Sequence, residues 1–183
     1  MADKKRVSVQ TLCLCALFAA LTAALSQVAV PNPLSPGVPV TFAHISIFTA
    51  AGLLGAKYAT VSQVLFVLLG AIGLPVFTQF QGGLHRIVGP TGGYIVGNIG
   101  CVLIAALIID RFGRSVKVLV LAMLAGYVST YFFGIAWFMY ITNTGLRAAL
   151  IGILPFMPGE AVKIIASVIL IKRLYPFVAK RRP

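Results

Sequence analysis

Glu160 and Lys163 are two charged residues at the start of the last apolar stretch of the chain, directly after Pro158 and Gly159. Because they are three residues apart, a helix places both side chains on one face. Ionisable groups in apolar, membrane-type segments are costly and usually serve a function. A carboxylate accepts N–H hydrogen bonds and an ammonium donates them, so the pair could clamp a small polar ligand. Alternatively, the two side chains pair with each other and only stabilise the start of the helix.

A second group of polar side chains lies in Gly73–Tyr94, GLPVFTQFQGGLHRIVGPTGGY, which we call the lid segment. Its two prolines and six glycines break helices and permit tight backbone folding. Long loops between spans are more often functional than plain connectors, so we interpret this one as a lid that folds back over a pocket. Arg86 can hold a carboxylate through two parallel hydrogen bonds. Gln79 and Gln81 offer neutral donors and acceptors, and all three side chains could instead face water.

The histidines and cysteines predict neither a metal site nor a cofactor. No further ligands accompany His44 and His85 at metal-binding spacing, and His44 is more typical of a hydrogen-bonded helix residue. The three cysteines lie in apolar runs, as small core residues do. An intramembrane enzyme with Glu160 as base and His85 as acid is a remote alternative, since the two lie in different loops without a nucleophile.

Composition excludes an ordinary soluble domain. The chain has 183 residues, of which 60% are hydrophobic and only 10% charged, against about a quarter charged in soluble domains. Its net charge of +12 does not indicate nucleic-acid binding, because the basic residues flank apolar runs. We therefore expect a single all-α integral membrane domain over residues 1–183, embedded in membrane lipid.

The apolar runs predict six transmembrane helices joined by long extracellular loops that cap a ligand pocket. Lys57 marks a turn between the second and third spans, and a short helix is expected at 147–153. The predicted spans cover residues 7–30, 42–56, 59–72, 92–109, 118–139 and 160–174.

Basic residues predict the orientation in a bacterial plasma membrane. Most of them fall on one side of the six-span topology, including the N-terminus, 1–6, and the tail, 175–183. The positive-inside rule then makes both termini cytoplasmic. The opposite side keeps Arg86, Arg147 and Lys163.

The first apolar run carries small side chains at Ala16, Ala20 and Ala24, four residues apart. Such a face lets another helix approach closely in lipid. The partner could be another helix of this chain or a second membrane subunit.

Three sequence blocks resemble the BioY family, the biotin-specific substrate-binding components of energy-coupling-factor transporters. They are GLPVF at 73–77, GPTGGY at 89–94 and PFMPGEAVK at 155–163, with PVT at 39–41 and ALFAAL at 16–21 in support. The resemblance covers nearly the whole chain. It implies a six-helix fold that captures biotin from outside under the first and third extracellular loops. It also implies a transmembrane coupling subunit and two ATP-hydrolysing subunits as partners.

The resemblance also implies roles for individual residues. Glu160 and Lys163 match the acidic and lysine positions that help hold biotin, and Arg86 matches the basic residue of the lid. Tyr94 ends the second block and joins the substrate-binding candidates. The alanine face at Ala16, Ala20 and Ala24 would contact the coupling subunit.

Two departures from the family pattern stand out. Glu160 replaces the usual aspartate and is one methylene longer. Ala43 and His44 stand in the block where many relatives have glutamine. Two alternatives stay open: a substrate-binding component for another vitamin, and a stand-alone biotin facilitator.

Overall fold

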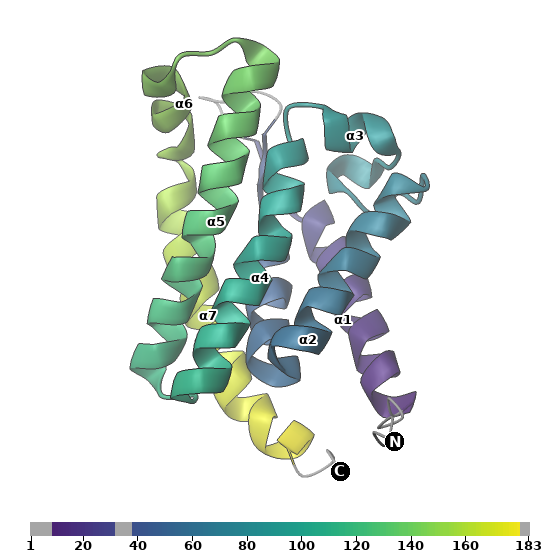
Figure 1. Ribbon diagram of the computed structural model, residues 1–183, viewed down its shortest axis with the longest axis vertical. Coiled ribbons are helices and arrows are strands. Elements are labelled where there is room, and N and C mark those ends of the chain that lie inside the picture. The colour runs from purple at the N-terminus through teal and green to yellow at the C-terminus, as the bar shows by residue number, and fades with distance from the viewer. Residues whose placement is uncertain (1–8, 32–37, 180–183) are drawn as a thin grey trace, which may run out of the picture.

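The computed structural model of the protein describes residues 9–31 and 38–179, and nearly all of them are helical (Figure 1). This part of the chain contains seven α-helices, one 3-10 helix and two short antiparallel strands, in which Val30 pairs with Val40. The elements are α1 (Val9–Gln27), β1 (Ala29–Val30), β2 (Val40–Thr41), α2 (Ala43–Ala71), η1 (Thr78–Phe80), α3 (Leu84–Val88), α4 (Gly92–Phe112), α5 (Val116–Thr142), α6 (Leu146–Ile153) and α7 (Phe156–Ala179).

Four helices, α1, α2, α4 and α5, are long and apolar enough to cross a membrane, and the bent pair α6–α7 makes a fifth candidate. Helices that are apolar on all sides suit lipid or a fully buried position. The prediction of an all-α chain with several membrane-spanning helices is confirmed, as is the short helix before the last span. Six separate spans are not found in the part of the chain that the structure describes, because the second and third predicted spans together form α2.

Helix α2 is interrupted at Gly55 rather than turned at Lys57, which is an exposed residue inside the helix. Gly55 has φ 75° and ψ 169°, a conformation that favours glycine. The amide of the next residue, Ala56, donates to Asp110 Oδ2 at the end of α4 over 2.8 Å. The carboxylate thereby caps the second arm of α2, so Asp110 explains why the helix can break here.

Small residues bring α4 and α5 into close contact. A Cβ on Gly97 would lie 2.9 Å from Thr130 Cα, and one on Gly126 would lie 2.9 Å from the Cys101 carbonyl oxygen. In lipid, where burial of apolar surface gives helices little reason to associate, such close backbone approach is a main source of packing energy. The two helices therefore form a rigid unit, and each contributes side chains to the site described below.

The lid segment is not the continuous non-helical loop expected from its glycines and prolines. It contains η1 and α3, and its last residues form the first turn of α4. Phe77 anchors it: the side chain is buried, and its ring packs edge-on against Phe66 at a centroid distance of 5.6 Å. A side chain at Gly70 would overlap the Phe77 ring. The segment is therefore held in the bundle at its middle as well as at its ends.

The first residues of α1 and the last of α7 lie at one end of the molecule, while α3 and α6 lie at the other (Figure 1). Helix α7 begins at Phe156, four residues before the predicted start at Glu160. Pro158 fits the first helical turn, where backbone N–H groups have no helical acceptor. The predicted basic N-terminus, the middle of the proline-rich loop 30–40 and the last tail residues lie outside the described residues.

Candidate ligand-binding site

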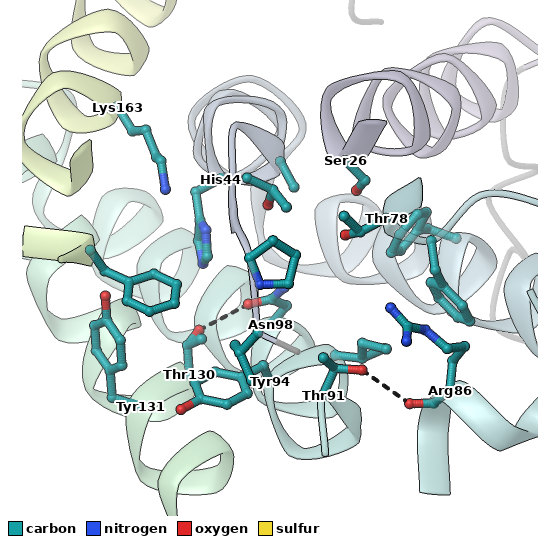
Figure 2. Close-up of a pocket in the computed structure, with 18 of the residues that line it drawn as sticks. Ser26, His44, Thr78, Arg86, Thr91, Tyr94, Asn98, Thr130, Tyr131 and Lys163 are labelled. Carbon is teal, nitrogen blue, oxygen red and sulfur yellow. Dashed lines mark hydrogen bonds between the residues drawn. The ribbon is translucent and has the colours of Figure 1, made fainter. Parts of the chain in front are cut away.

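A cavity lies between the helices, and residues from both halves of the chain line it (Figure 2). The lid segment contributes part of its wall, and β2 with the two residues before it and α1, α2, α4, α5 and α7 contribute the rest. The lining residues are Ser26, Val38, Pro39, Thr41, Ala43, His44, Phe66, Phe77, Thr78, Arg86, Thr91, Tyr94, Ile95, Asn98, Thr130, Tyr131, Phe156, Glu160 and Lys163.

Glu160 and Lys163 form a buried ion pair at this cavity. Lys163 Nζ donates to Glu160 Oε1 over 2.9 Å, and the two residues are 1% and 6% exposed respectively. The Tyr131 hydroxyl donates to the same oxygen at 3.4 Å. Among residues 9–31 and 38–179, nothing hydrogen-bonds to the buried Glu160 Oε2. The pair thus stabilises the start of the helix and still offers one buried acceptor. A mutual ion pair and a ligand-binding role are therefore compatible.

Arg86 lies on α3 and points into the cavity, across from Lys163 (Figure 2). Its Nε is buried and has no hydrogen-bond partner in the described part of the chain. The Thr91 hydroxyl donates to the Arg86 carbonyl over 3.3 Å, which fixes the backbone of this residue. The cavity therefore has a cation at each side and a carboxylate beside only one of them.

His44, which the sequence favours as an ordinary helix residue, lines the cavity from the first turn of α2. Its ring lies 4.8 Å from the Tyr127 ring and 5.7 Å from the Phe48 ring, between centroids. Both ring nitrogens are buried and neither forms a well-aligned hydrogen bond with a described residue, although the Asn98 side chain lies close enough to interact with the ring. An imidazole carries a donor and an acceptor, or two donors, so its nitrogens are suited to a polar group of a ligand.

Polar side chains of α4 and α5 complete the site. Thr130 Oγ1 donates to Asn98 Oδ1 over 3.1 Å, which directs the asparagine and leaves its amide donors for other partners (Figure 2). Tyr94, one of the predicted substrate-binding residues, lines the cavity from the first turn of α4, and its ring packs over Gly134. The signal that could have identified Asn98 is an amide side chain inside an otherwise apolar span.

Other predicted residues lie outside the cavity. Gln79 is exposed, and Gln81 pairs its backbone with Phe77, so neither side chain is among those that line the cavity. Thr78 lines it from the same turn. The alanines at 16, 20 and 24 are exposed on α1 and face away from the bundle. Within the described ranges, no three His, Cys, Asp or Glu side chains come together as a metal site would require.

Comparison with known proteins places these features in a family. A sequence profile of the BioY family matches residues 1–180. A probable biotin transporter BioY from Pyrococcus horikoshii is 37% identical over 161 residues, covering 88% of this chain and 93% of that protein. A biotin transporter BioY from Rhizobium etli is 32% identical, covering 96% of this chain and 100% of the relative. A crystal structure of the biotin S-component of an ECF-type ABC transporter matches with a TM-score of 0.86, 30% identity and 94% coverage of each chain. The chain belongs to the BioY family.

Proposed function

We propose that this protein is the substrate-binding subunit of a biotin uptake system. It captures biotin from the extracellular side and delivers it together with an ATP-driven coupling module. Its family consists of transporter components, so it is not an enzyme. The biotin transporters among its relatives and the biotin S-component that shares its fold support biotin as the ligand.

The observation that carries the proposal is the set of buried polar atoms that meet at one cavity. Glu160 Oε2 and Arg86 Nε accept or donate no hydrogen bond within the described residues, and the His44 nitrogens form no well-aligned one, although all three side chains line the cavity. A buried polar group without a hydrogen bond costs about 1–3 kcal/mol. A ligand that pairs with these atoms recovers that free energy, so the site is arranged for a molecule with several polar groups.

Biotin has the matching chemistry. Its ureido ring offers two N–H donors and one carbonyl, and its pentanoate tail ends in a carboxylate. We assign an ureido N–H to Glu160 Oε2 and the ureido oxygen to the Lys163 side of the cavity, where the ammonium has further N–H groups to donate. Arg86, on the opposite side, receives the tail carboxylate. Phe66, Phe77, Phe156 and Ile95 supply apolar walls for the fused rings and the aliphatic tail.

The proposed topology has six crossings, with the two arms of α2 on either side of Gly55 counted separately. Three basic residues lie where α4 meets α5, at the end away from α3 and α6: Arg111 in the last turn of α4, Arg114 in the connecting turn and Lys117 in the first turn of α5. By the positive-inside rule that end is cytoplasmic. Both termini are then cytoplasmic, and the cavity opens toward the outside beneath the lid segment.

The exposed alanines of α1 support a partner within the membrane. Ala16, Ala20 and Ala24 form a strip of small side chains that no described part of this chain covers. Close helix approach at such a strip is favourable in lipid. We infer that the transmembrane coupling subunit, with its two ATPase subunits, docks there.

Biotin binding to the purified protein in detergent tests the function. The double variant Glu160→Ala/Lys163→Ala should lose affinity by at least about a hundredfold, because both polar contacts of the ureido group disappear. The matched control is Asp110→Ala/Arg114→Ala, which removes the second ion pair found among the described residues, away from the cavity. Unchanged affinity in the first variant would contradict the assigned site, and absence of binding by the wild type would contradict the function.

Competition with other water-soluble vitamins distinguishes biotin from a different ligand of the same fold. A stand-alone facilitator is distinguished by uptake in cells that lack a coupling module. In cells that contain the coupling module, Ala20→Trp should leave uptake unchanged if no partner docks on α1, and abolish module-dependent uptake if one does.

A further inference from the structure

Gln27, the last residue of α1, joins this helix to the lid segment. Its side-chain amide Nε2 donates to the carbonyl oxygens of Val76 and Phe77 over 3.2 and 3.0 Å, and also contacts the Ala23 carbonyl. Its Oε1 accepts from the Phe80 amide over 2.8 Å. One carboxamide therefore binds three residues of the lid backbone. No sequence motif points to this contact, because the partners are far apart in the chain.

The backbone that Gln27 holds is in an unfavourable conformation. Gln79 and Phe80 have φ values of 62° and 54°, which side-chain-bearing residues rarely adopt. Such residues persist only where surrounding contacts over-determine them, and they concentrate at ligand clamps and switch regions. The hydrogen bond from the Phe80 amide to Gln27 helps to hold this strained conformation, because Phe80 is the second of the two strained residues.

The held turn is also part of the cavity wall. Phe77 and Thr78, which lie between the two bonded ends of the turn, both line the cavity, as does Ser26 beside Gln27. The far end of the lid segment is attached elsewhere: Trp137 Nε1 on α5 donates to the Gly89 carbonyl over 2.9 Å. The first half of the lid segment is thus held by α1 through Gln27 and by α2 through Gly70 and the Phe66 ring, and its far end is held by the α4–α5 unit.

We propose that Gln27 is a positioning residue that makes the first half of the lid segment move with α1. A displacement of α1 relative to α4 and α5 then shifts Phe77 and Thr78 at the cavity and lets the strained turn relax. Helix α1 carries the exposed alanine strip on its outer side, so a partner packed there acts on the cavity through Gln27. The effect on biotin rests on the proposed function, whereas the mechanical link does not.

Hydrogen–deuterium exchange tests the link without any ligand. Gln27→Met keeps the side-chain length but removes every hydrogen bond from this side chain to the lid segment, and it should speed exchange in peptides covering 76–84 by about tenfold or more. Gln27→Glu keeps the acceptor for the Phe80 amide and should protect that amide while exposing its neighbours to faster exchange. Gln10→Met, an exposed glutamine at the other end of α1, is the matched control and should change nothing in the lid segment. Exchange that stays at the wild-type rate in both Gln27 variants would overturn the proposal.

Distance measurement between spin labels tests whether α1 and the lid segment move together. Labels on Ala20→Cys and Phe80→Cys, in a Cys13→Ser background, use two exposed positions, and the remaining cysteines are buried. The distance distribution should be narrow with Gln27 present and broad in Gln27→Met. Equal widths would show that the glutamine does not fix the lid to α1.

Biotin dissociation from the same variants links the contact to the function. Gln27→Met should release biotin about tenfold faster than the wild type and Gln10→Met at the wild-type rate. Faster exchange with unchanged dissociation would overturn the role in ligand retention. If the wild type binds no biotin, the proposed function fails, while the exchange and distance measurements still decide the link.

Discussion

The two ends of the helical bundle hold charged side chains in different ways. At the end where α4 meets α5, Asp110 pairs with Arg114 at 3.6 Å and caps the second arm of α2. Arg114 Nε donates to the Gly52 carbonyl over 2.9 Å, and its guanidinium stacks on Tyr175. At the cavity, Glu160 Oε2 and Arg86 Nε lack hydrogen-bond partners within the described residues, and the His44 nitrogens form no well-aligned hydrogen bond there.

The polar groups at one end therefore stabilise the fold, whereas those at the cavity are available to bind a ligand. The charges around Asp110 are satisfied by the protein itself, and their effect is to hold the interrupted helix in place. The groups at the cavity are only partly satisfied, which lowers the stability of the protein unless a ligand completes them. Substitutions around Asp110 should therefore change mainly stability, and substitutions at the cavity should change ligand affinity. Four substitutions test this difference.

The largest effect is expected from Glu160→Ala. It removes a ligand contact and leaves the Lys163 ammonium buried without a counter-charge, which costs about 3–5 kcal/mol. Both biotin affinity and thermal stability should fall. The added Lys163→Met change should restore part of the stability and none of the affinity. A double variant that recovered binding would show that the pair only supports the helix.

Gly55→Ala should lower stability by about 2 kcal/mol without changing biotin affinity. The residue has φ 75°, and its new Cβ would lie 3.0 Å from Asp110 Oδ2, so the substitution disturbs both the backbone and the cap. Thermal unfolding and equilibrium binding measure the two quantities. Gly113→Ala is the matched control, because it also has a positive φ, 86°, but meets no neighbour within 4 Å. Weakened binding in Gly55→Ala would mean that this end is coupled to the cavity.

Arg86→Gln should weaken biotin binding by about tenfold, the loss expected for one charge-assisted contact. The same variant should bind biotin methyl ester as the wild type does, since the ester has no carboxylate for Arg86. Arg147→Gln, an exposed arginine on α6, provides the control. An equal loss for acid and ester would place the carboxylate elsewhere in the cavity.

The smallest effect is expected from His44→Phe, which keeps a ring against Tyr127 and removes both nitrogens. We expect about fivefold weaker binding, as for the loss of one neutral hydrogen bond, and a small gain in stability. His44→Gln, which keeps a hydrogen-bond donor and acceptor at this position, should bind more tightly than His44→Phe. Identical affinities for the wild type and His44→Phe would exclude the imidazole from recognition.

Several features of the site follow from local sequence, and others do not. The three-residue spacing of Glu160 and Lys163 correctly predicts that they share a helix face at the start of the last span. The glycine content of the lid segment predicts tight turns but gives no indication of η1 and α3. A single helical turn is too short to show a helical pattern of apolar residues. Gln79 and Gln81 resemble good ligand contacts in sequence, yet the positive φ at Gln79 and the pairing of Gln81 with Phe77 place them outside the cavity lining.

The sequence alone determines the membrane class, the approximate positions of the apolar segments and the residues that share each helix face. These properties depend on composition and on the helical period, both of which are local. Only the tertiary structure decides that His44 and Asn98 meet Glu160, that Asp110 caps a break more than fifty residues away, and that Gln27 binds the lid segment. Contacts of this kind depend on how the helices pack, and packing through small residues and a kinked helix is a property of the whole chain.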